Sequence, residues 1–279
     1  MRYLTGKNNL KLPVLGMGTW CFGGREERNS ANDDAGQIAA LQSGIACGFE
    51  LIDTAEYYAN GYAEELIGKA ISGIEREKLF LTSKVWKTHL KRDEVFRAAE
   101  RSLKRLKTDH LDCYLYHQVD ESVPLAETIG AMNELVEEGM VRHIGVSNFS
   151  LKRLKRAMGY SSVPIVLNQV HCNLAVRDAS DELEEFCRKN GVIFQAWRPQ
   201  RDLEETDSTR AICQKRNITF AQLALAWLLN RENIAVITAM KNPQHLTENM
   251  KALEIKLSAE EMAILDSYPI RRPCTVPLK

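Results

Sequence analysis

The chain lacks the features that mark membrane, nucleic-acid-binding and secreted proteins. No run of about 18 apolar residues occurs, so we expect no membrane span. The 37 lysine and arginine residues are balanced by 37 acidic residues, which argues against nucleic acid as the main partner because phosphate binding needs a basic surface. The first residues contain no apolar core of a secretory signal. Together these absences predict a cytoplasmic protein.

Paired cysteines are also missing. The seven cysteines are an odd number, are scattered along the chain and form no Cys-x-x-Cys pair. Neither a disulfide framework nor a zinc site is expected from such spacing. We therefore predict buried, reduced thiols and no bound metal.

Several short motifs of common enzyme classes are absent as well. The sequence contains no GxGxxG fingerprint, no phosphate-binding P-loop, no GxSxG nucleophile elbow and no HExxH metal motif. A catalytic site must therefore be assembled from residues that are distant from one another in the sequence.

What the chain does contain is a repeated alternation of short apolar runs with longer amphipathic stretches. Continuous apolarity is typical of parallel strands that are buried on both faces. The repeat of about thirty residues has the size of one strand–helix–strand unit. The eight apolar runs are residues 14–20, 50–55, 79–86, 111–117, 141–148, 164–170, 192–197 and 234–240.

The stretches between the runs carry helical periodicity, as in Phe96, Ala99, Leu103 and Leu106. Eight strand–helix units without a change in composition predict an α/β fold, a (β/α)8 TIM barrel that spans residues 1–279 as a single domain.

Two additions flank the repeats. Residues 2–12 have the pattern of a β-hairpin with a polar turn at residues 7–9. Near the other end, Ser258 is followed by Glu261, the spacing of a capping box, which predicts a C-terminal helix.

Polar side chains stand at the carboxyl ends of most runs, where the chemistry of barrels gathers. Singly, each has an ordinary explanation, such as a helix cap for an aspartate or a solvent-seeking lysine. Together they would meet at one mouth, which favours a functional site. They are Asp53, Lys84, His117, Ser147, Asn148, Asn168, Gln169 and Trp197.

The residue types favour proton transfer to an oxygen atom. Asp53 and Lys84 carry opposite charges on neighbouring strands, and Tyr57 and Tyr58 follow Asp53. A lysine ammonium lowers the pKa of a nearby tyrosine, which makes the phenol a usable general acid. His117 can then donate a hydrogen bond to a substrate oxygen. The other half of the reaction would come from a cofactor.

Six segments in this order resemble the aldo-keto reductase family over essentially the whole chain. The most diagnostic of them has a tyrosine five residues after the aspartate, which selects Tyr58 over Tyr57. The matching segments are LGMGTW (15–20), DTAEYYANGYAEELIGKAI (53–71), SKVW (83–86), LDCYLYH (111–117), IGVSNF (144–149) and NQV (168–170).

The resemblance implies an NAD(P)H-dependent enzyme that reduces aldehyde or ketone carbonyls to alcohols. It implies that Tyr58 donates the proton, that Lys84 and Asp53 tune it, and that His117 orients the carbonyl. It also implies that Trp20 and Trp86 line an apolar substrate wall, although packing in the core or at the rim would also explain these tryptophans.

The resemblance assigns the cofactor contacts too. Ser147, Asn148 and Gln169 would hold the nicotinamide carboxamide, with Asp53 beside them, and Trp197 would stack on the nicotinamide ring. Glu248 and Asn249 match positions that contact adenine. The full set of expected cofactor contacts is Asp53, Ser147, Asn148, Gln169, Trp197, Arg198, Gln200, Met240, Lys241, His245, Glu248 and Asn249.

The chain departs from the family pattern at several of these positions. Ala59 follows Tyr58 where glycine is common, and Gln118 follows His117 where tryptophan is common. Arg198 replaces a small hydroxyl residue, so it either reaches the cofactor pyrophosphate or crowds it.

The eighth run carries the departure that bears on the cofactor. Ala239 fills the position of a lysine that binds the 2′-phosphate of NADPH, and His245 fills that of an arginine. Lys241 lies two residues on and offers a substitute. We therefore expect NADPH as cofactor and leave NADH open.

A second reading is a cofactor-binding barrel that senses redox state with little turnover. The complete set of Asp53, Tyr58, Lys84 and His117 favours the enzyme. We expect a small-molecule carbonyl substrate as the partner, no nucleic acid or membrane partner, and a monomer.

Overall fold

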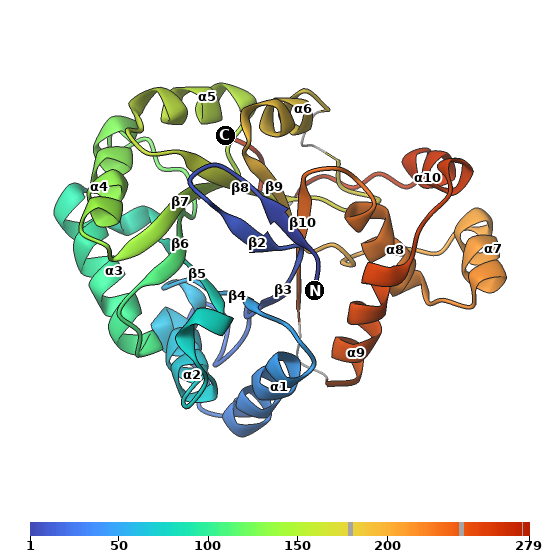
Figure 1. The fold of residues 1–279 in the computed structure, drawn as a ribbon, viewed down its shortest axis with the longest axis horizontal. Coiled ribbons are helices and arrows are strands. Elements are labelled where there is room, and N and C mark those ends of the chain that lie inside the picture. Colours follow the sequence, from blue (N-terminus) through green and yellow to red (C-terminus); the bar gives the residue numbers. More distant parts are fainter. Residues whose placement is uncertain (178–180, 240–242, 275) are drawn as a thin grey trace.

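The computed structural model describes residues 1–177, 181–239, 243–274 and 276–279. Within these ranges each predicted apolar run contributes one strand, and the eight strands close into a parallel barrel in the order β10-β3-β4-β5-β6-β7-β8-β9 (Figure 1). Met240, the last residue of the eighth run, lies outside the described residues. The barrel strands are β3 (Leu15–Gly18), β4 (Leu51–Asp53), β5 (Phe80–Val85), β6 (Leu111–Tyr116), β7 (Val141–Ser147), β8 (Ile165–His171), β9 (Ile193–Trp197) and β10 (Ile234–Ala239).

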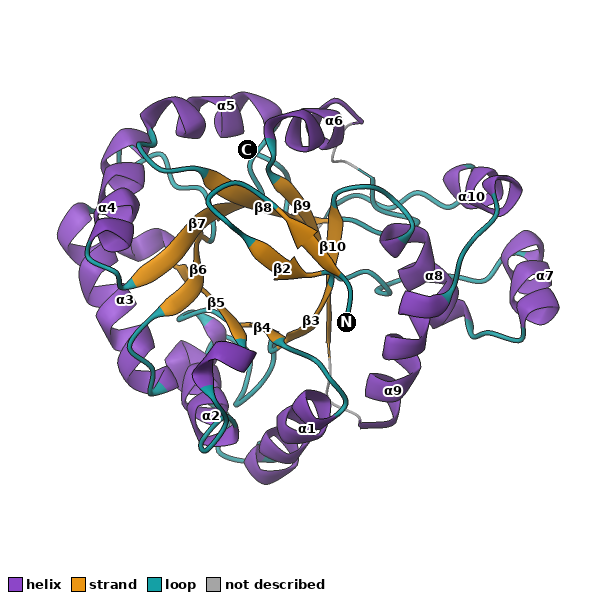
Figure 2. Cartoon of the chain, in the orientation of Figure 1, coloured by secondary structure: helices purple, strands orange, loops and turns teal. Residues whose placement is uncertain are grey.

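Helices follow the strands and cover the outside of the barrel (Figure 2). Their main members are α1 (Asp34–Ala46), α2 (Tyr62–Ala70), α3 (Arg92–Leu106), α4 (Leu125–Glu137), α5 (Leu151–Tyr160), α6 (Asp181–Asn190), α7 (Asp207–Arg216), α8 (Phe220–Leu229) and α9 (Pro243–Lys251). Short 3₁₀ turns are η1 (Tyr58–Gly61), η2 (Arg76–Lys78), η3 (Lys87–His89) and η4 (Ala252–Glu254). The alternation of strands and helices confirms the predicted (β/α)8 barrel.

The barrel strands are buried on both faces, which matches the continuous apolarity of their sequences. All six residues of β6 are buried, for example. The N-terminal hairpin, β1 (Tyr3–Thr5) with β2 (Lys11–Pro13), is confirmed, with Asn8 and Asn9 at its turn. Leu10 and Leu12 are 1 % and 0 % exposed and pack with side chains of the barrel strands. The hairpin therefore closes one end of the barrel.

The predicted C-terminal helix is also confirmed. Helix α10 (Ala259–Asp266) begins at Ser258, whose hydroxyl accepts from the Glu261 N–H while the Glu261 side chain accepts from the Ser258 N–H. This exchange satisfies two backbone donors that a helix start leaves without partners.

The seven cysteines form no disulfide in the described part of the chain, but their burial differs from the expectation at three positions. Cys113, Cys172, Cys187 and Cys274 are buried, whereas Cys21 and Cys213 are half-buried and Cys47 is exposed. Cys47 caps the end of α1, where the chain turns at the surface. Among the described helices, none has the length and apolarity needed to cross a bilayer.

A buried carboxylate fastens α2 to the strand that carries Lys84. Glu64 on α2 is 0 % exposed and accepts a hydrogen bond from Ser83 Oγ on β5 at 2.5 Å. It also forms an ion pair with Arg105 on α3, with 2.6 Å between Arg105 Nη2 and Glu64 Oε2. Because α2 begins at Tyr62, directly after the η1 turn that contains Tyr58, this contact fixes the tyrosine turn relative to β5.

We expect Glu64→Ala to lower the free energy of unfolding by about 3–5 kcal/mol, since it leaves the Arg105 charge without its buried partner. Thermal unfolding followed by circular dichroism measures the change. The control is Glu75→Ala, which removes an exposed ion pair with Lys78 and should cost at most about 1 kcal/mol. Equal melting temperatures for both variants and the wild type would contradict this role for Glu64.

Candidate active site

A buried ammonium group lies at the centre of the site. Lys84 is 0 % exposed, and its Nζ donates to Asp53 Oδ2 at 2.7 Å, to the Thr54 carbonyl at 2.7 Å and to the Tyr58 hydroxyl at 3.2 Å. Asp53 ends β4 and Lys84 lies on β5, the next strand of the barrel. The predicted pairing of these two charges across neighbouring strands is present. All three ammonium protons have acceptors, which is the condition for burying such a charge.

The turn after β4 brings Tyr58, and not Tyr57, to the ammonium. Ala59, Asn60 and Gly61 all have positive φ, at 50°, 52° and 87°. A glycine would adopt this backbone more easily at position 59, because the methyl group disfavours the left-handed region by about 1–2 kcal/mol. The Ala59 N–H donates to the Arg25 carbonyl at 2.7 Å, which ties the turn to the loop after β3.

The net pKa shift of Tyr58 is opposite to the expected one. Burial raises the pKa of Tyr58; Lys84 acts to lower it, and Asp53 adds to the rise. The sequence-based expectation had the sign of the lysine effect right but omitted the cost of charging a phenol away from water. Tyr58 therefore carries its proton at neutral pH. Burial also opposes the charge on Lys84, but Asp53 and Tyr58 outweigh it and raise the pKa of Lys84.

His117 lies beside Tyr58 in a neutral state. The two rings have centroids 5.6 Å apart, and the Trp86 ring is 5.0 Å from His117. Burial, with a further contribution from Lys84, holds the pKa of His117 well below its usual value. Its Nδ1 atom is buried and has no hydrogen-bond partner among the described residues. A neutral imidazole of this kind offers a hydrogen bond to a ligand without a competing charge.

A chain of hydrogen bonds connects this centre to the ends of β7, β8 and β9. Gln169 Nε2 donates to Asp53 Oδ1 and to Gln195 Oε1, both at 2.8 Å. Ser147 Oγ donates to the Gln169 carbonyl at 3.0 Å, and Asn148 Nδ2 donates to Ser147 Oγ at 3.0 Å. The indole N–H of Trp197 donates to Asn148 Oδ1 at 3.2 Å. Five of the predicted cofactor contacts, Asp53, Ser147, Asn148, Gln169 and Trp197, are thus brought together.

The remaining predicted cofactor contacts are placed less closely. Arg198 lies 5.1 Å from the Trp197 ring centroid, and its charge acts to lower the Tyr58 pKa, which places it near the mouth. Gln200 donates to Asn249 Oδ1 at 3.0 Å and accepts from Thr238 at 2.9 Å. His245 and Glu248 are exposed on α9, while Met240 and Lys241 lie outside the described residues.

Three aromatic rings form a wall next to Tyr58 and His117. Trp20 contacts Tyr58 edge to face at 5.0 Å, and Trp86 contacts His117. The third ring is Tyr57, which stacks on Trp86 with centroids 3.6 Å apart. Both tryptophans therefore lie beside Tyr58 and His117, and their contact with a substrate stays a prediction. We call Trp20, Tyr57 and Trp86 the aromatic wall.

Sequence reasoning missed two of these site residues. Tyr57 was considered only as a rival proton donor, although its position next to Tyr58 was a signal for a place in the wall. His171 stacks on Trp197 with centroids 4.4 Å apart and an interplanar angle of 16°. It ends β8, one residue beyond the predicted run, so a longer run would have included it among the polar strand ends.

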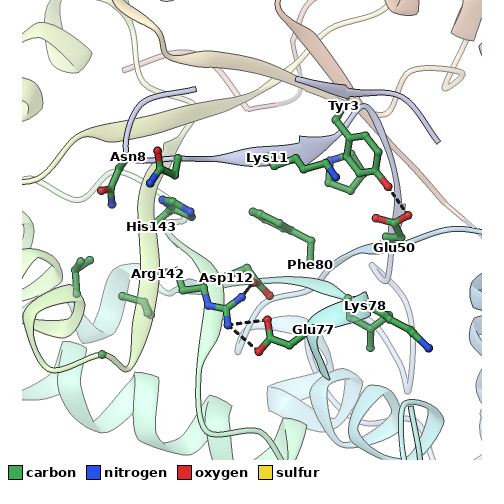
Figure 3. Close-up of a pocket in the computed structure, with 16 residues that line it drawn as sticks. Tyr3, Asn8, Lys11, Glu50, Glu77, Lys78, Phe80, Asp112, Arg142 and His143 are labelled. Atoms are coloured by element: carbon green, nitrogen blue, oxygen red, sulfur yellow. Dashed lines mark hydrogen bonds and ion pairs between the residues drawn. The ribbon is translucent and has the colours of Figure 1, made fainter. Parts of the chain in front are cut away.

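Two of the cavities among the described residues are lined by side chains other than Tyr58, Lys84, Asp53 and His117. Gln118 and Asn148 line a small one of about 140 Å³ together with the C-terminal residues Val276, Pro277 and Lys279. Gln118, which stands where tryptophan is common in the family, therefore lines a cavity beside the site. The other cavity, of about 590 Å³, lies between the N-terminal hairpin and the amino ends of the barrel strands (Figure 3).

The carboxylates drawn in that second cavity are already paired. Glu50 accepts from the Tyr3 hydroxyl, and Arg142 pairs with both Glu77 and Asp112. These contacts give Glu50, Glu77 and Asp112 a structural role.

Comparison with known proteins agrees with this geometry. The model of the Aldo/keto reductase family matches residues 14–269. The chain is similar to the methylglyoxal reductase YeaE of Escherichia coli (strain K12), with 35 % identity over 94 % of this chain and 93 % of that protein. It is also similar to the NADH-specific methylglyoxal reductase of the same strain, with 26 % identity over 93 % and 95 % of the two chains.

Two solved structures have the same fold. The thermostable aldo-keto reductase Tm1743, in complex with the inhibitor epalrestat, has a TM-score of 0.93 and 45 % identity, with 96 % of this chain and all of that chain covered. An aldo-keto reductase of Klebsiella pneumoniae in complex with NADPH has a TM-score of 0.86 and 36 % identity, with 99 % of each chain covered. Matches over nearly the full length, together with the barrel and its strand-end residues, show that the chain belongs to the aldo/keto reductase family.

Proposed function

We propose that the protein reduces aldehyde or ketone carbonyls to alcohols with NADPH, and that Tyr58 donates the proton. The observation that carries this proposal is the contact between the buried Lys84 ammonium and the Tyr58 hydroxyl. A phenol that is protonated at neutral pH and lies beside a neutral histidine suits delivery of a proton to a carbonyl oxygen. Family membership supports the same reaction class.

The cofactor assignment rests on the polar groups near Trp197. Both protons of the Gln169 amide are used, on Asp53 and Gln195, so its Oε1 points away from these partners. We propose that this oxygen, with Ser147 and Asn148, holds the carboxamide of a nicotinamide ring. The similar aldo-keto reductase of Klebsiella pneumoniae forms a complex with NADPH, which supports a nicotinamide cofactor here. The donor and acceptor types fit such an amide. When bound, the reduced nicotinamide supplies the hydride.

The catalytic roles follow from the positions of the side chains. His117 donates a hydrogen bond to the substrate carbonyl oxygen and orients it. Tyr58 gives its proton to the same oxygen as negative charge develops there. Lys84 then lies within hydrogen-bond distance of the phenolate and stabilises it, while Asp53 keeps the lysine in place. The aromatic wall excludes water from the reacting atoms.

We expect Tyr58→Phe to lower kcat for methylglyoxal by at least about a hundredfold, because the variant loses its general acid. The affinity for NADPH should change little, since the ring and its surroundings remain. Loss of NADPH absorbance measures turnover, and fluorescence titration measures binding.

Tyr160→Phe is the matched control, because it removes a hydroxyl from an exposed tyrosine on α5. It should retain full turnover. Full activity of Tyr58→Phe would contradict the proton-donor role, and cofactor binding by the wild type without any turnover would favour a redox-sensing barrel.

The second prediction concerns the cofactor phosphate. Ala239 ends β10, is exposed, and stands where related enzymes carry a phosphate-binding lysine. We expect the wild type to bind NADPH, and Ala239→Lys to raise the preference for NADPH over NADH by about ten- to a hundredfold, the value of one charged hydrogen bond.

Quenching of tryptophan fluorescence by each cofactor measures this preference. Ala239→Leu is the control for side-chain size and should leave the preference unchanged. An unchanged preference in Ala239→Lys would contradict the placement of the 2′-phosphate at β10. Absence of quenching by both cofactors would contradict the cofactor assignment itself.

A further inference from the structure

Gln195 is a polar side chain buried within a strand of apolar residues. It is 0 % exposed, and its neighbours on β9, Phe194 and Ala196, are buried and apolar. Its Oε1 accepts a hydrogen bond from Gln169 Nε2 at 2.8 Å, whereas its own Nε2 has no hydrogen-bond partner among the described residues. A buried N–H without a partner costs free energy, so an apolar side chain of the same length would pack here at least as well. Packing alone therefore does not account for a glutamine at this position.

The hydrogen-bond partner of Gln195 is Gln169, a proposed cofactor contact on the neighbouring strand. The two residues stand directly opposite each other in the register of β8 and β9 (Figure 1). Side chains at such positions lie on the same face of a sheet. Because Gln169 also reaches Asp53 on β4, which lies across the barrel from β8, both amides are on the inner side of the barrel.

Two acceptors fix the amide plane of Gln169. Its Nε2 donates to Asp53 Oδ1 and to Gln195 Oε1, both at 2.8 Å. Its main-chain carbonyl accepts from Ser147 Oγ at 3.0 Å and from the Asn148 N–H at 2.9 Å, so the backbone is held as well. Asp53 alone would leave the amide free to rotate about a single hydrogen bond. The second acceptor, on Gln195, therefore sets the direction in which Gln169 Oε1 points.

We propose that Gln195 is a positioning residue for the nicotinamide carboxamide, because it holds Gln169 Oε1 where this oxygen accepts from the carboxamide NH2 group. This inference rests on the proposed binding of a nicotinamide cofactor. Gln195 acts only through Gln169 and does not itself contact the cofactor. When the acceptor oxygen of Gln195 is removed, one N–H of Gln169 loses its partner, the amide turns, and the hydrogen bond from the carboxamide weakens.

The test compares NADP⁺ with its 3-acetylpyridine analogue, in which a methyl group replaces the carboxamide NH2. Isothermal titration calorimetry measures both dissociation constants for the wild type and for Gln195→Met, which keeps the side-chain length and loses the acceptor. We expect the wild type to bind NADP⁺ about three- to tenfold more tightly than the analogue, the value of one hydrogen bond. In Gln195→Met this preference should fall to about twofold or less, since the bond that produces it is weakened.

Gln195→Glu is the conservative variant that should restore the preference. A carboxyl group in this buried position is protonated, because burial raises its pKa, and it still offers an acceptor oxygen to Gln169. It should therefore prefer NADP⁺ nearly as strongly as the wild type does. A role in packing alone predicts the opposite order, with the apolar Gln195→Met closer to the wild type.

Two controls locate the effect at Gln169. Gln169→Leu removes the amide itself, so the addition of Gln195→Met to this variant should leave the preference unchanged. Gln214→Met makes the same replacement at an exposed position on α7 and should behave like the wild type. Thermal unfolding checks that each barrel is intact. Gln195→Met should melt close to the wild type, since an unpartnered N–H on Gln169 replaces the one on Gln195.

The outcomes separate this inference from the proposed function. A full preference for NADP⁺ in Gln195→Met would overturn the role of Gln195 and leave the proposed cofactor site standing. A wild type that binds both ligands equally would overturn the bond between the carboxamide and Gln169, and this inference with it, while turnover of methylglyoxal with NADPH would still support carbonyl reduction. A wild type that binds neither ligand would overturn the cofactor assignment itself.

Discussion

The site depends on one buried charge, the ammonium of Lys84. Removing such a charge from water costs several kcal/mol, and only close acceptors offset this cost. Asp53, the Thr54 carbonyl and the Tyr58 hydroxyl supply them. Each acceptor is then fixed in turn: Asp53 by Gln169, and Tyr58 by the positive-φ turn that ends at Gly61. The proposed proton donor and a group of amide side chains are thereby held by the same ion pair.

Burial and the Lys84 charge act on the pKa of Tyr58 in opposite directions. Burial holds the proton on the phenol, and the lysine charge reduces the cost of releasing it. In the proposed reaction this balance keeps the acid loaded at neutral pH, while the phenolate has a counter-ion as soon as it forms. In the same proposed reaction the neutral His117 orients the carbonyl oxygen through a hydrogen bond and adds no second positive charge. The aromatic wall keeps water away, which strengthens each of these interactions.

Much of this arrangement could be predicted from the sequence. Apolar runs with a regular repeat gave all eight strands, and polar residues at their ends gave the Asp53–Lys84 pair and the group around Gln169. The direction of the Tyr58 pKa could not be predicted, because it depends on how completely the folded chain excludes water. The stacking of Tyr57 depends on loop contacts such as Ala59 with Arg25, which leave no periodic signal. The expected contacts of Met240 and Lys241 lie outside the described residues and remain predictions.

The most direct test of the account is a titration of Tyr58 itself, by carbon-13 NMR of protein labelled at the tyrosine ring carbon that bears the hydroxyl. The Tyr58 resonance is the one absent from the spectrum of Tyr58→Phe. The account predicts that Tyr58 stays protonated beyond its ordinary pKa of 10.0, and that Lys84→Met moves its midpoint higher still. A midpoint below that value in the wild type, or a lower midpoint in Lys84→Met, would contradict the balance of burial and charge on which the proposed mechanism rests.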